Sequence, residues 1–168
     1  FFTEIRLNIK LRMITRLIYP LALRAKISYK LYNYFPDLYD KDIRLAFGCK
    51  VKMDLIKTDL GHKSIIFNGF YELALTRRIT GLAKKGGLMI DAGANFGYFS
   101  CLWASLNNNN RVIAFEASPD NIAPLINNVN KNGFADKIKV VPAALSRSEG
   151  VIAFSRGGHA SQTGWGGL

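Results

Sequence analysis

A repeated order of short apolar runs and helix-like segments between residues 88 and 141 constrains this chain most. An apolar run at 88–90 leads into a glycine-containing turn at 91–97, and further apolar runs follow at 112–115 and 138–141. Short apolar runs separated by helical segments are typical of parallel strands joined by crossover helices. The order predicts a strand, turn, helix, strand, helix and strand, which is one half of a doubly wound sheet.

The two helical segments carry signals of their own. Residues 98–104 are almost entirely apolar and follow the glycine turn directly. The second helix is expected to begin at Ser118 and Pro119, because Ser caps a helix well and Pro suits the first helical position. Gly133 is expected to end it. These signals favour an α/β fold.

The composition agrees with one folded domain. The 168 residues are 49% hydrophobic and 12% aromatic, which excludes a disordered or low-complexity chain. About two thirds of the unfolded surface can be buried at this length. Cys49 and Cys101 have no C-x-x-C spacing and no nearby His, so neither a disulfide framework nor a metal site is expected. Such sparse use of cysteine fits a reducing compartment, and we expect the protein in the cytoplasm.

Residues 1–48 are predicted to form a basic helical extension that precedes a domain at 49–168. Between 5 and 27, apolar residues recur at spacings of three and four, with Arg12 and Arg16 on the opposite side. This is the pattern of an amphipathic helix. We expect it to pack on the domain that follows; contact with a membrane surface or a partner protein is the alternative. The sequence has neither a signal-peptide pattern nor a segment apolar enough to span a bilayer.

Residues 49–87 are expected to lead into the sheet as a β-hairpin and a helix. Apolar and polar residues alternate at 51–55, a turn surrounds His62, and another apolar run follows at 64–67. This pattern predicts a hairpin with an exposed His62 in its turn. Residues 71–85 are predicted to be helical, with three inward-facing residues: Leu73, Ile79 and Leu82.

The net charge of +11 belongs to the first half of the chain. Residues 1–85 hold 17 basic and 7 acidic side chains, whereas residues 86–150 hold 5 of each. A positive first half could meet phosphate, lipid headgroups or an acidic partner, or it could be a solvated face. The glycine turn has no interleaved aromatic and basic residues nearby, so nucleic acid is not the expected partner.

The glycine turn indicates a nucleotide-type ligand, because glycines let a ligand approach the backbone at a helix start. A dinucleotide fingerprint needs glycine at the first, third and sixth positions. Counted from Gly93, the third position is Asn95 and the sixth is Tyr98, so NAD is disfavoured. The acid Asp91 would also repel a pyrophosphate. An acid suits a ligand that carries an ammonium and a sulfonium group, as S-adenosylmethionine does.

A second acid supports this interpretation. Glu116 lies 19 residues beyond Gly97, at the end of the next predicted strand. A carboxylate at this place can accept hydrogen bonds from both hydroxyls of a ribose. The turn and the two acids together therefore favour adenosylmethionine over a purely structural arrangement.

Four segments resemble the FkbM-type family of adenosylmethionine-dependent methyltransferases: D-A-G-A-N-F-G-Y-F-S (91–100), A-F-E-A-S-P-D-N (114–121), N-N-V-N-K-N-G (127–133) and V-V-P-A-A-L-S (140–146). The resemblance extends upstream and covers about residues 50 to 168. It implies a Rossmann-like methyltransferase fold with a mostly parallel sheet. It also implies methylation of a hydroxyl oxygen, often on a sugar, a glycan or a secondary metabolite.

The resemblance also implies which residues bind the cofactor. The turn would hold the methionine part through Asp91, Gly93, Asn95 and Gly97. Glu116 would bind the ribose, and Ser118 would line the adenosine. The adenine would lie against Ala144 and its neighbours Ala143 and Leu145. Glu72, beside Tyr71, would lie at the cofactor entrance near the ligand ammonium; a helix N-terminal acid is the alternative role of Glu72.

The resemblance leaves the catalytic base and the end of the fold open. His159 is one candidate base, and Gln162 and Trp165 are candidates for substrate contact. The family domain continues with a fourth strand that pairs with the first, whereas this sequence ends at residues 164–168. We therefore expect a fold that is incomplete at its C-terminus, with the edge of the first strand open.

Three other functions stay open at this stage. A non-catalytic adenosylmethionine-binding or interaction module fits an incomplete domain. A nucleic-acid methyltransferase or binder would use the positive charge, and steeply salt-dependent binding would support it. A dinucleotide oxidoreductase is disfavoured by the missing glycine at the third position.

Overall fold

The computed structural model describes residues 43–48, 50–56, 58–151 and 153, together with isolated positions between 20 and 30. The amphipathic helix predicted at 5–27 lies outside these residues apart from a few isolated positions. The described elements, in chain order, are β1 (Ile43–Arg44), β2 (Lys52–Met53), α3 (Leu60–Asn68), α4 (Leu73–Ala83), β3 (Leu88–Ala92), α5 (Tyr98–Leu106), β4 (Arg111–Phe115), α6 (Pro119–Lys131) and β5 (Ile138–Val141).

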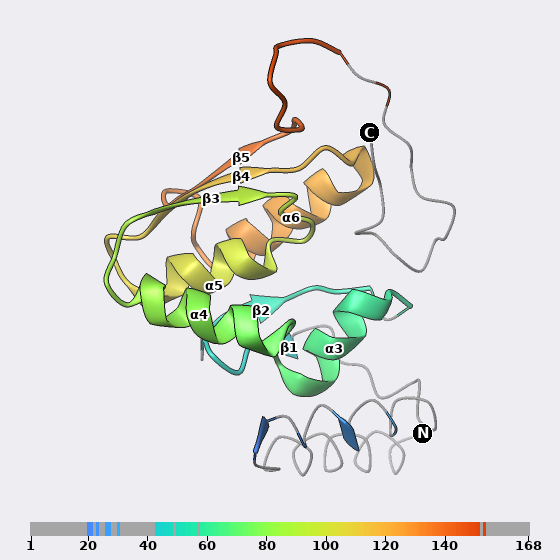
Figure 1. Ribbon diagram of the computed structural model, residues 1–168, viewed down its shortest axis with the longest axis vertical. Coiled ribbons are helices and arrows are strands. Elements are labelled where there is room, and N and C mark those ends of the chain that lie inside the picture. The colour runs from blue at the N-terminus through green and yellow to red at the C-terminus, as the bar shows by residue number, and fades with distance from the viewer. Residues whose placement is uncertain are drawn as a thin grey trace.

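The predicted α/β arrangement between residues 88 and 141 is confirmed. β3, β4 and β5 form a three-stranded sheet in that order, and both strand pairs are parallel. The register pairs Asp91 with Ala114, so that β3 and β4 end side by side. Figure 1 shows the strands as one layer, with α4, α5 and α6 as a second layer on one side. The carboxyl ends of all three strands therefore meet at one edge of the sheet.

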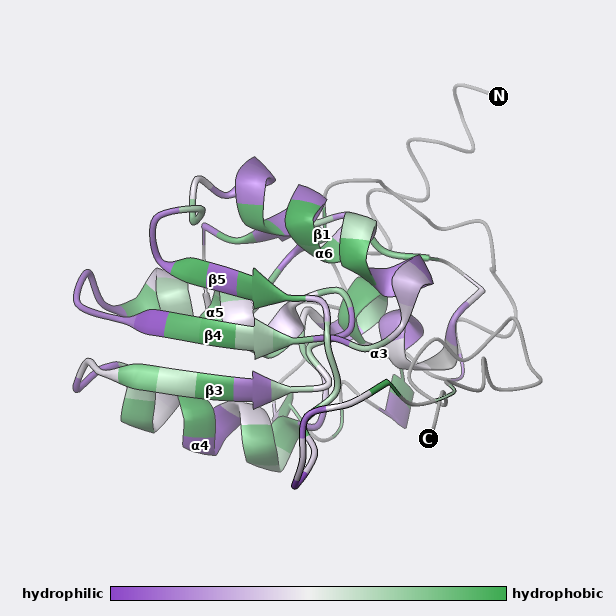
Figure 2. Ribbon diagram, turned by 90° about the horizontal axis from the view of Figure 1, so that it is seen from above, coloured by the Kyte–Doolittle hydropathy of each residue, from purple (hydrophilic) through white to green (hydrophobic). Residues whose placement is uncertain are grey.

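The other face of the sheet is open in the described part of the chain. Leu88 and Ile90 in β3 are each 61% exposed, although parallel strands are normally covered on both faces. Figure 2 shows no described helix in front of the three arrows. β3 is also one of the two edge strands of this sheet. In the described part of the chain, the three-stranded sheet thus has its helices on one face.

The predicted hairpin at 49–68 is wrong in its second half. β1 and β2 form a short antiparallel pair, and β1 lies upstream of residue 49. Residues 60–68 form the helix α3 instead of a strand. The side chain of Asp59 caps its start by accepting the N–H of His62, and Gly69 ends it in a left-handed conformation. The apolar run at 65–67 fits a buried helix as well as a strand, and the two caps decide for the helix.

The inward residues of α4 are confirmed only in part. Leu73 and Ile79 pack partly buried against the core. Leu82 is 48% exposed, so the prediction that it faces inward is wrong. Thr76 and Ala83 are the fully buried residues of this helix. The small Ala83 lets α4 lie close to the loop before β4, where its carbonyl accepts the Asn110 side-chain amide.

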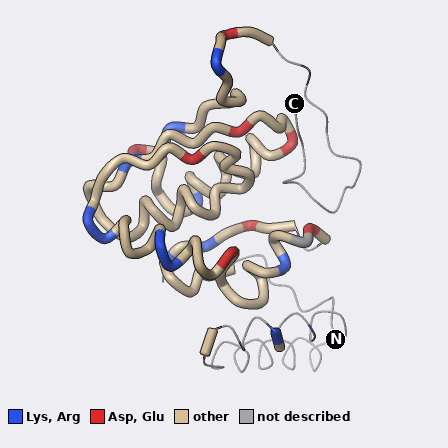
Figure 3. The backbone as a smooth tube through the Cα atoms, viewed as in Figure 1, with Lys and Arg blue, Asp and Glu red and all other residues tan. Residues whose placement is uncertain are grey.

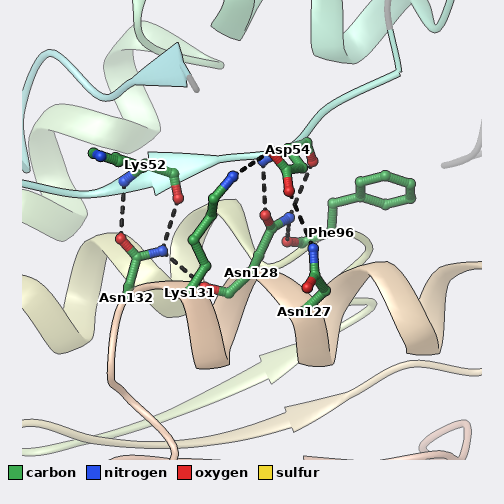
Figure 4. A network of polar contacts seen from close by, with 7 residues as sticks. All are labelled: Lys52, Asp54, Phe96, Asn127, Asn128, Lys131 and Asn132. Atoms are coloured by element: carbon green, nitrogen blue, oxygen red, sulfur yellow. Dashed lines mark hydrogen bonds and ion pairs between the residues drawn. The ribbon is translucent and has the colours of Figure 1, made fainter. Parts of the chain in front are cut away.

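Two asparagines, Asn128 of α6 and Asn132 at the C-cap of this helix, hold the segment around β2 (Figure 4). Asn132 accepts the N–H of Lys52 at 2.9 Å and donates to the Lys52 carbonyl at 2.7 Å. Asn128 accepts the N–H of Asp54 at 2.8 Å and donates to the Asp54 carbonyl at 3.2 Å. Residues four apart on a helix are about 6 Å apart along its axis, and residues two apart on a strand about 6.6 Å, so the spacings match. The two side-chain amides thus make the hydrogen bonds that a neighbouring strand would make with the backbone of this segment.

Asn128 also reaches the glycine turn. Its side-chain amide donates to the carbonyl of Phe96 at 3.0 Å, and the residue is fully buried. One side chain therefore joins α6, the segment after β2 and the turn at the start of α5. Asn127, its neighbour on α6, is exposed and makes a side-chain bond to the Asp54 carboxylate.

We expect Asn128→Ala to destabilise the fold much more than Asn127→Ala. The Asn128 change leaves the Asp54 N–H and the Phe96 carbonyl without this partner, which should lower the free energy of unfolding by about 3 kcal/mol. The Asn127 change removes only an exposed bond and should stay within about 0.5 kcal/mol. Urea unfolding of both variants and the parent chain measures the difference. Equal losses would show that the bridge does not stabilise the fold.

Candidate functional site

The candidate site lies at the carboxyl ends of β3 and β4, around the turn at 93–97. Three residues of this turn have a left-handed backbone: Gly93 (φ 78°), Asn95 (φ 50°) and Gly97 (φ 83°). Glycine adopts this conformation without cost, and Asn tolerates it better than most residues. The sequence of the turn thus allows three left-handed residues within five. The chain can therefore turn tightly from the end of β3 into the start of α5.

The carboxylate of Glu116 fixes the turn from the next strand. It follows β4 directly, and its side chain is buried. One carboxylate oxygen accepts the backbone N–H of Asn95 at 2.6 Å, and the other accepts that of Ser118 at 2.7 Å. The structure therefore brings together three of the predicted site residues, Asn95, Glu116 and Ser118, through two charge-assisted hydrogen bonds.

The backbone N–H groups of the turn donate hydrogen bonds to other groups of the protein. Gly93 and Ala94 both donate to the carbonyl of Phe115 at 2.9 Å, and Asn95 donates to Glu116. Three consecutive donors of the turn are therefore engaged by β4 and the residue after it. A phosphate-binding loop needs such donors directed at the ligand. This turn instead has open space at Gly93 and two acids, Asp91 and Glu116, beside it, which suits a cationic or neutral ligand better than an anion.

The two glycines of the turn face different surroundings. A Cβ built at Gly93 would meet no heavy atom within 4 Å, so this backbone borders open space. A Cβ built at Gly97 would lie 2.6 Å from Cδ1 of Leu125 in α6. Gly97 thus permits close packing of α5 on α6, whereas Gly93 leaves room for a ligand at the end of β3.

Asp91 lies in β3 just before the turn. Its carboxylate accepts a hydrogen bond of 2.6 Å from the hydroxyl of Ser100 in α5. Burial raises the pKa of Asp91, the negative charge of Glu116 raises it further, and the hydrogen bonds from Ser100 oppose both effects. The two acids are therefore near enough to repel each other, and a positive charge placed between them would be stabilised.

Glu72 stands at the start of α4 with an exposed side chain and a left-handed backbone at φ 39°, which is unusual for a residue other than glycine. Burial, and then the charge of Glu72 and a hydrogen bond with it, raise the pKa of the neighbouring Tyr71. The Tyr71 ring meets the ring of Tyr98 edge to face, with centroids 6.4 Å apart. Glu72 is thus tied to the first turn of α5 through Tyr71.

The remaining predicted site residues fall beyond β5. Ala143, Ala144 and Leu145 lie in the exposed segment after this strand, and the N–H of Ala143 bonds to the Val141 carbonyl. This segment leaves the sheet at the same edge as the glycine turn. The other three predicted residues, His159, Gln162 and Trp165, lie outside the described residues.

The prediction that His62 is exposed is wrong. The side chain is 4% exposed and packs its ring on Phe96 of the glycine turn, with centroids 4.4 Å apart. Its Nδ1 accepts the N–H of Ile56 at 3.1 Å. His62 therefore touches the candidate site from α3. The N-cap at Asp59, three residues earlier, is the sequence signal that could have placed it on a helix.

The described residues hold no group of three or more His, Cys, Asp or Glu side chains arranged to bind a metal ion. Burial, with a smaller effect of the Asp91 charge, raises the pKa of the Cys101 thiol to about 12, so it is protonated at neutral pH. No helix in this part of the chain is both long and apolar enough to cross a membrane.

No protein-family model matches the chain, and no curated protein matches it significantly. The interpretation of the site therefore depends on its own geometry.

We expect Gly97→Ala to destabilise the fold more than Gly93→Ala. Both changes force alanine into a left-handed conformation, at about 1 kcal/mol each. The added methyl at Gly97 also collides with Leu125 and should bring the loss to about 3 kcal/mol. Denaturant unfolding of the two variants measures the difference, and the matched conformations make Gly93→Ala the control. Similar losses would contradict the packing role of Gly97.

The stability of the protein should fall in mild acid because of His62. Burial lowers the pKa of His62 below its ordinary value of 6.5, and this effect exceeds the opposing influences of Asp59 and Asn95. Below pH 6.5 the unfolded chain therefore takes up a proton more readily than the folded chain. The contribution of neutral His62 is complete above this pH and is lost as the pH falls toward the lowered pKa. Thermal unfolding across this range, with His62→Gln as the control, should give a shallower pH dependence in the variant.

Proposed function

We propose that this chain belongs to an adenosylmethionine-dependent methyltransferase similar to the FkbM-type family. The cofactor binds at the carboxyl ends of β3 and β4, and the methyl acceptor is a hydroxyl group of a small molecule or glycan. The observation that carries the proposal is the buried Glu116 carboxylate, held between the N–H groups of Asn95 and Ser118. A carboxylate fixed at the end of the second strand is placed to accept hydrogen bonds from a ribose.

The chemistry of the turn supports this cofactor over a dinucleotide. The N–H groups of Gly93, Ala94 and Asn95 are engaged within the protein, so they are not directed at a pyrophosphate. Asp91 and Glu116 raise the local negative charge instead. A ligand with an ammonium and a sulfonium group relieves the repulsion between the two acids, whereas a pyrophosphate adds to it. The residues present therefore fit adenosylmethionine.

Each residue of the site has a role in the proposal. The open backbone at Gly93 and the Asp91 carboxylate take the methionine part, and Asn95 lines the same side. Gly97 keeps the start of α5 close to α6. Glu116 takes the ribose, Ser118 and Ala144 line the adenosine, and Glu72 attracts the ligand ammonium from the start of α4. These roles use the acceptors that the turn and the strand ends provide.

The bound cofactor supplies the activated methyl group. The chain contributes alignment of the acceptor hydroxyl and exclusion of competing ligands, because the sulfonium itself provides the driving force. A positioned base would speed the transfer by taking the hydroxyl proton. His159 stays our candidate for this base.

A second candidate function is non-catalytic binding of the same cofactor. The open edge and face of β3, with Leu88 and Ile90 each 61% exposed, favour a module that works against another polypeptide segment. The nucleic-acid alternative has less support. In Figure 3, Lys and Arg are dispersed over helices and loops of the described chain, with Asp and Glu among them, whereas a nucleic-acid interface has a basic stripe.

The proposal predicts that the chain binds S-adenosylhomocysteine and that Glu116→Ala weakens this binding by about 10- to 100-fold, the effect of losing charge-assisted hydrogen bonds. Isothermal titration calorimetry measures both affinities. Asp136→Ala is the matched control, because Asp136 is an exposed acid before β5, at the opposite edge of the sheet. Circular dichroism confirms that each variant is folded. Tight binding of NAD, or equal binding by the Glu116 and Asp136 variants, would overturn the assignment. Methyl transfer to a hydroxyl acceptor separates the enzyme from the non-catalytic module.

A further inference from the structure

Ser100 is a fully buried residue of α5 to which the proposed function gives no role. Its hydroxyl donates to a carboxylate oxygen of Asp91 at 2.6 Å. A serine inside a helix often bonds instead to the carbonyl four residues earlier. At this position that carbonyl belongs to Phe96, and it accepts the side-chain amide of Asn128. The hydroxyl of Ser100 therefore joins the first turn of α5 to the end of β3.

The alternation along β3 explains why the two side chains meet. Successive residues of a strand point to opposite faces, and Leu88 and Ile90 are exposed on the open face of the sheet. Asp91 therefore points toward the helix layer, where Ser100 lies. Asp91 is only partly buried, and the backbone at Gly93, two residues later, borders open space. The carboxylate is thus held from the helix side at the edge where a ligand has room.

The surroundings of Asp91 disfavour its negative charge. Burial raises the pKa of Asp91, the charge of Glu116 raises it further, and hydrogen bonding with Ser100 lowers it. Among the residues that the structure describes, no Lys or Arg forms an ion pair with Asp91. The hydroxyl of Ser100 therefore stabilises a charge that two other influences oppose. A cationic group on a ligand would supply the missing counter-charge.

We propose that Ser100 is a positioning residue of the cofactor site: its hydroxyl holds the Asp91 carboxylate in place and in the charged form that binds the ammonium group of the ligand. This inference rests on the proposed function. It divides the cofactor into two parts, because the amino-acid part depends on Ser100 and the adenosine part does not. A ligand that lacks the ammonium group should bind equally well with and without the hydroxyl.

Two ligands and one matched control test this division. S-adenosylhomocysteine carries the ammonium group, whereas methylthioadenosine has the same adenosine and thioether without the amino-acid part. Calorimetry from about pH 5 to pH 8 measures the affinity of the parent chain, Ser100→Ala and Ser105→Ala for both ligands. Ser105 is the control because it lies in the same helix and its hydroxyl bonds to the carbonyl of Leu102, away from Asp91. Circular dichroism confirms that each variant is folded.

We expect Ser100→Ala to bind S-adenosylhomocysteine about tenfold more weakly than the parent at pH 6, since a hydrogen bond to a charged group is lost. Its affinity for methylthioadenosine should stay within about twofold, and Ser105→Ala should stay within about twofold for both ligands. The tenfold loss should grow as the pH falls, because Asp91 without the hydroxyl takes up a proton at a higher pH. Unchanged affinity for S-adenosylhomocysteine, equal losses for the two ligands or a loss independent of pH would overturn the proposal.

Other titratable groups face the same region. Glu116 acts on Asp91 from the end of β4, and His62 of α3 packs on the glycine turn. Cys101, the neighbour of Ser100, has a pKa raised to about 12 and stays protonated. All three are present in the parent and in Ser100→Ala, so the difference between the two pH profiles isolates Asp91. In an Asp91→Asn background, Ser100→Ala should have less than half of its effect on S-adenosylhomocysteine affinity. Full additivity would contradict a route through Asp91.

A measurement without ligand separates this inference from the proposed function. The NMR signal of the Asp91 side-chain carboxyl carbon follows its protonation directly. In Ser100→Ala the midpoint of this titration should rise by about one pH unit, and in Ser105→Ala it should stay unchanged. An unchanged midpoint in Ser100→Ala overturns the role of Ser100. A raised midpoint in a chain that binds neither ligand overturns the proposed function instead.

Discussion

The architecture of the site depends on the side-chain amide of Asn128. This fully buried amide bonds to the backbone of Asp54 on one side and to the carbonyl of Phe96 on the other. It thereby attaches the segment that leads into α3 to the turn that starts α5. A buried amide with both ends satisfied is rigid and specific, because every alternative position leaves a polar group without a partner. The same turn receives α3, where the His62 ring packs on Phe96.

Local signals account for what the sequence predicted correctly. The elements from β3 to β5 are marked by apolar runs of strand length, by glycines at the turn and by the Ser118–Pro119 helix start, and all of them formed as expected. The prediction failed where one local pattern suits two structures. The apolar run at 65–67 fits either a strand or a buried helix, and the deciding residues are the caps Asp59 and Gly69 at its two ends. Leu82 was misplaced for a related reason, since periodicity alone does not say which stripe of a short helix meets the core.

The candidate site likewise combines residues that have local sequence signals with a contact that depends on tertiary packing. The family resemblance assigns Asn95, Glu116 and Ser118 to one cofactor site, and the structure joins these three residues through two hydrogen bonds beside the carboxyl ends of β3 and β4. The contact of His62 with Phe96 has no local signal, because it links residues 34 positions apart through the docking of α3. Such a contact becomes visible only when the tertiary packing is known.

The role of the glycine turn follows from the partners of its N–H groups more than from its glycines. The same kind of turn can present a row of donors to a phosphate or hide them. Here the carbonyl of Phe115 takes two of them and Glu116 takes a third, so β4 decides the chemistry of a turn that belongs to β3 and α5. With three of its donors engaged inside the protein and two acids beside it, the turn is an unfavourable place for an anion. A glycine pattern in a sequence therefore identifies a ligand class only together with the strand that pairs beside it.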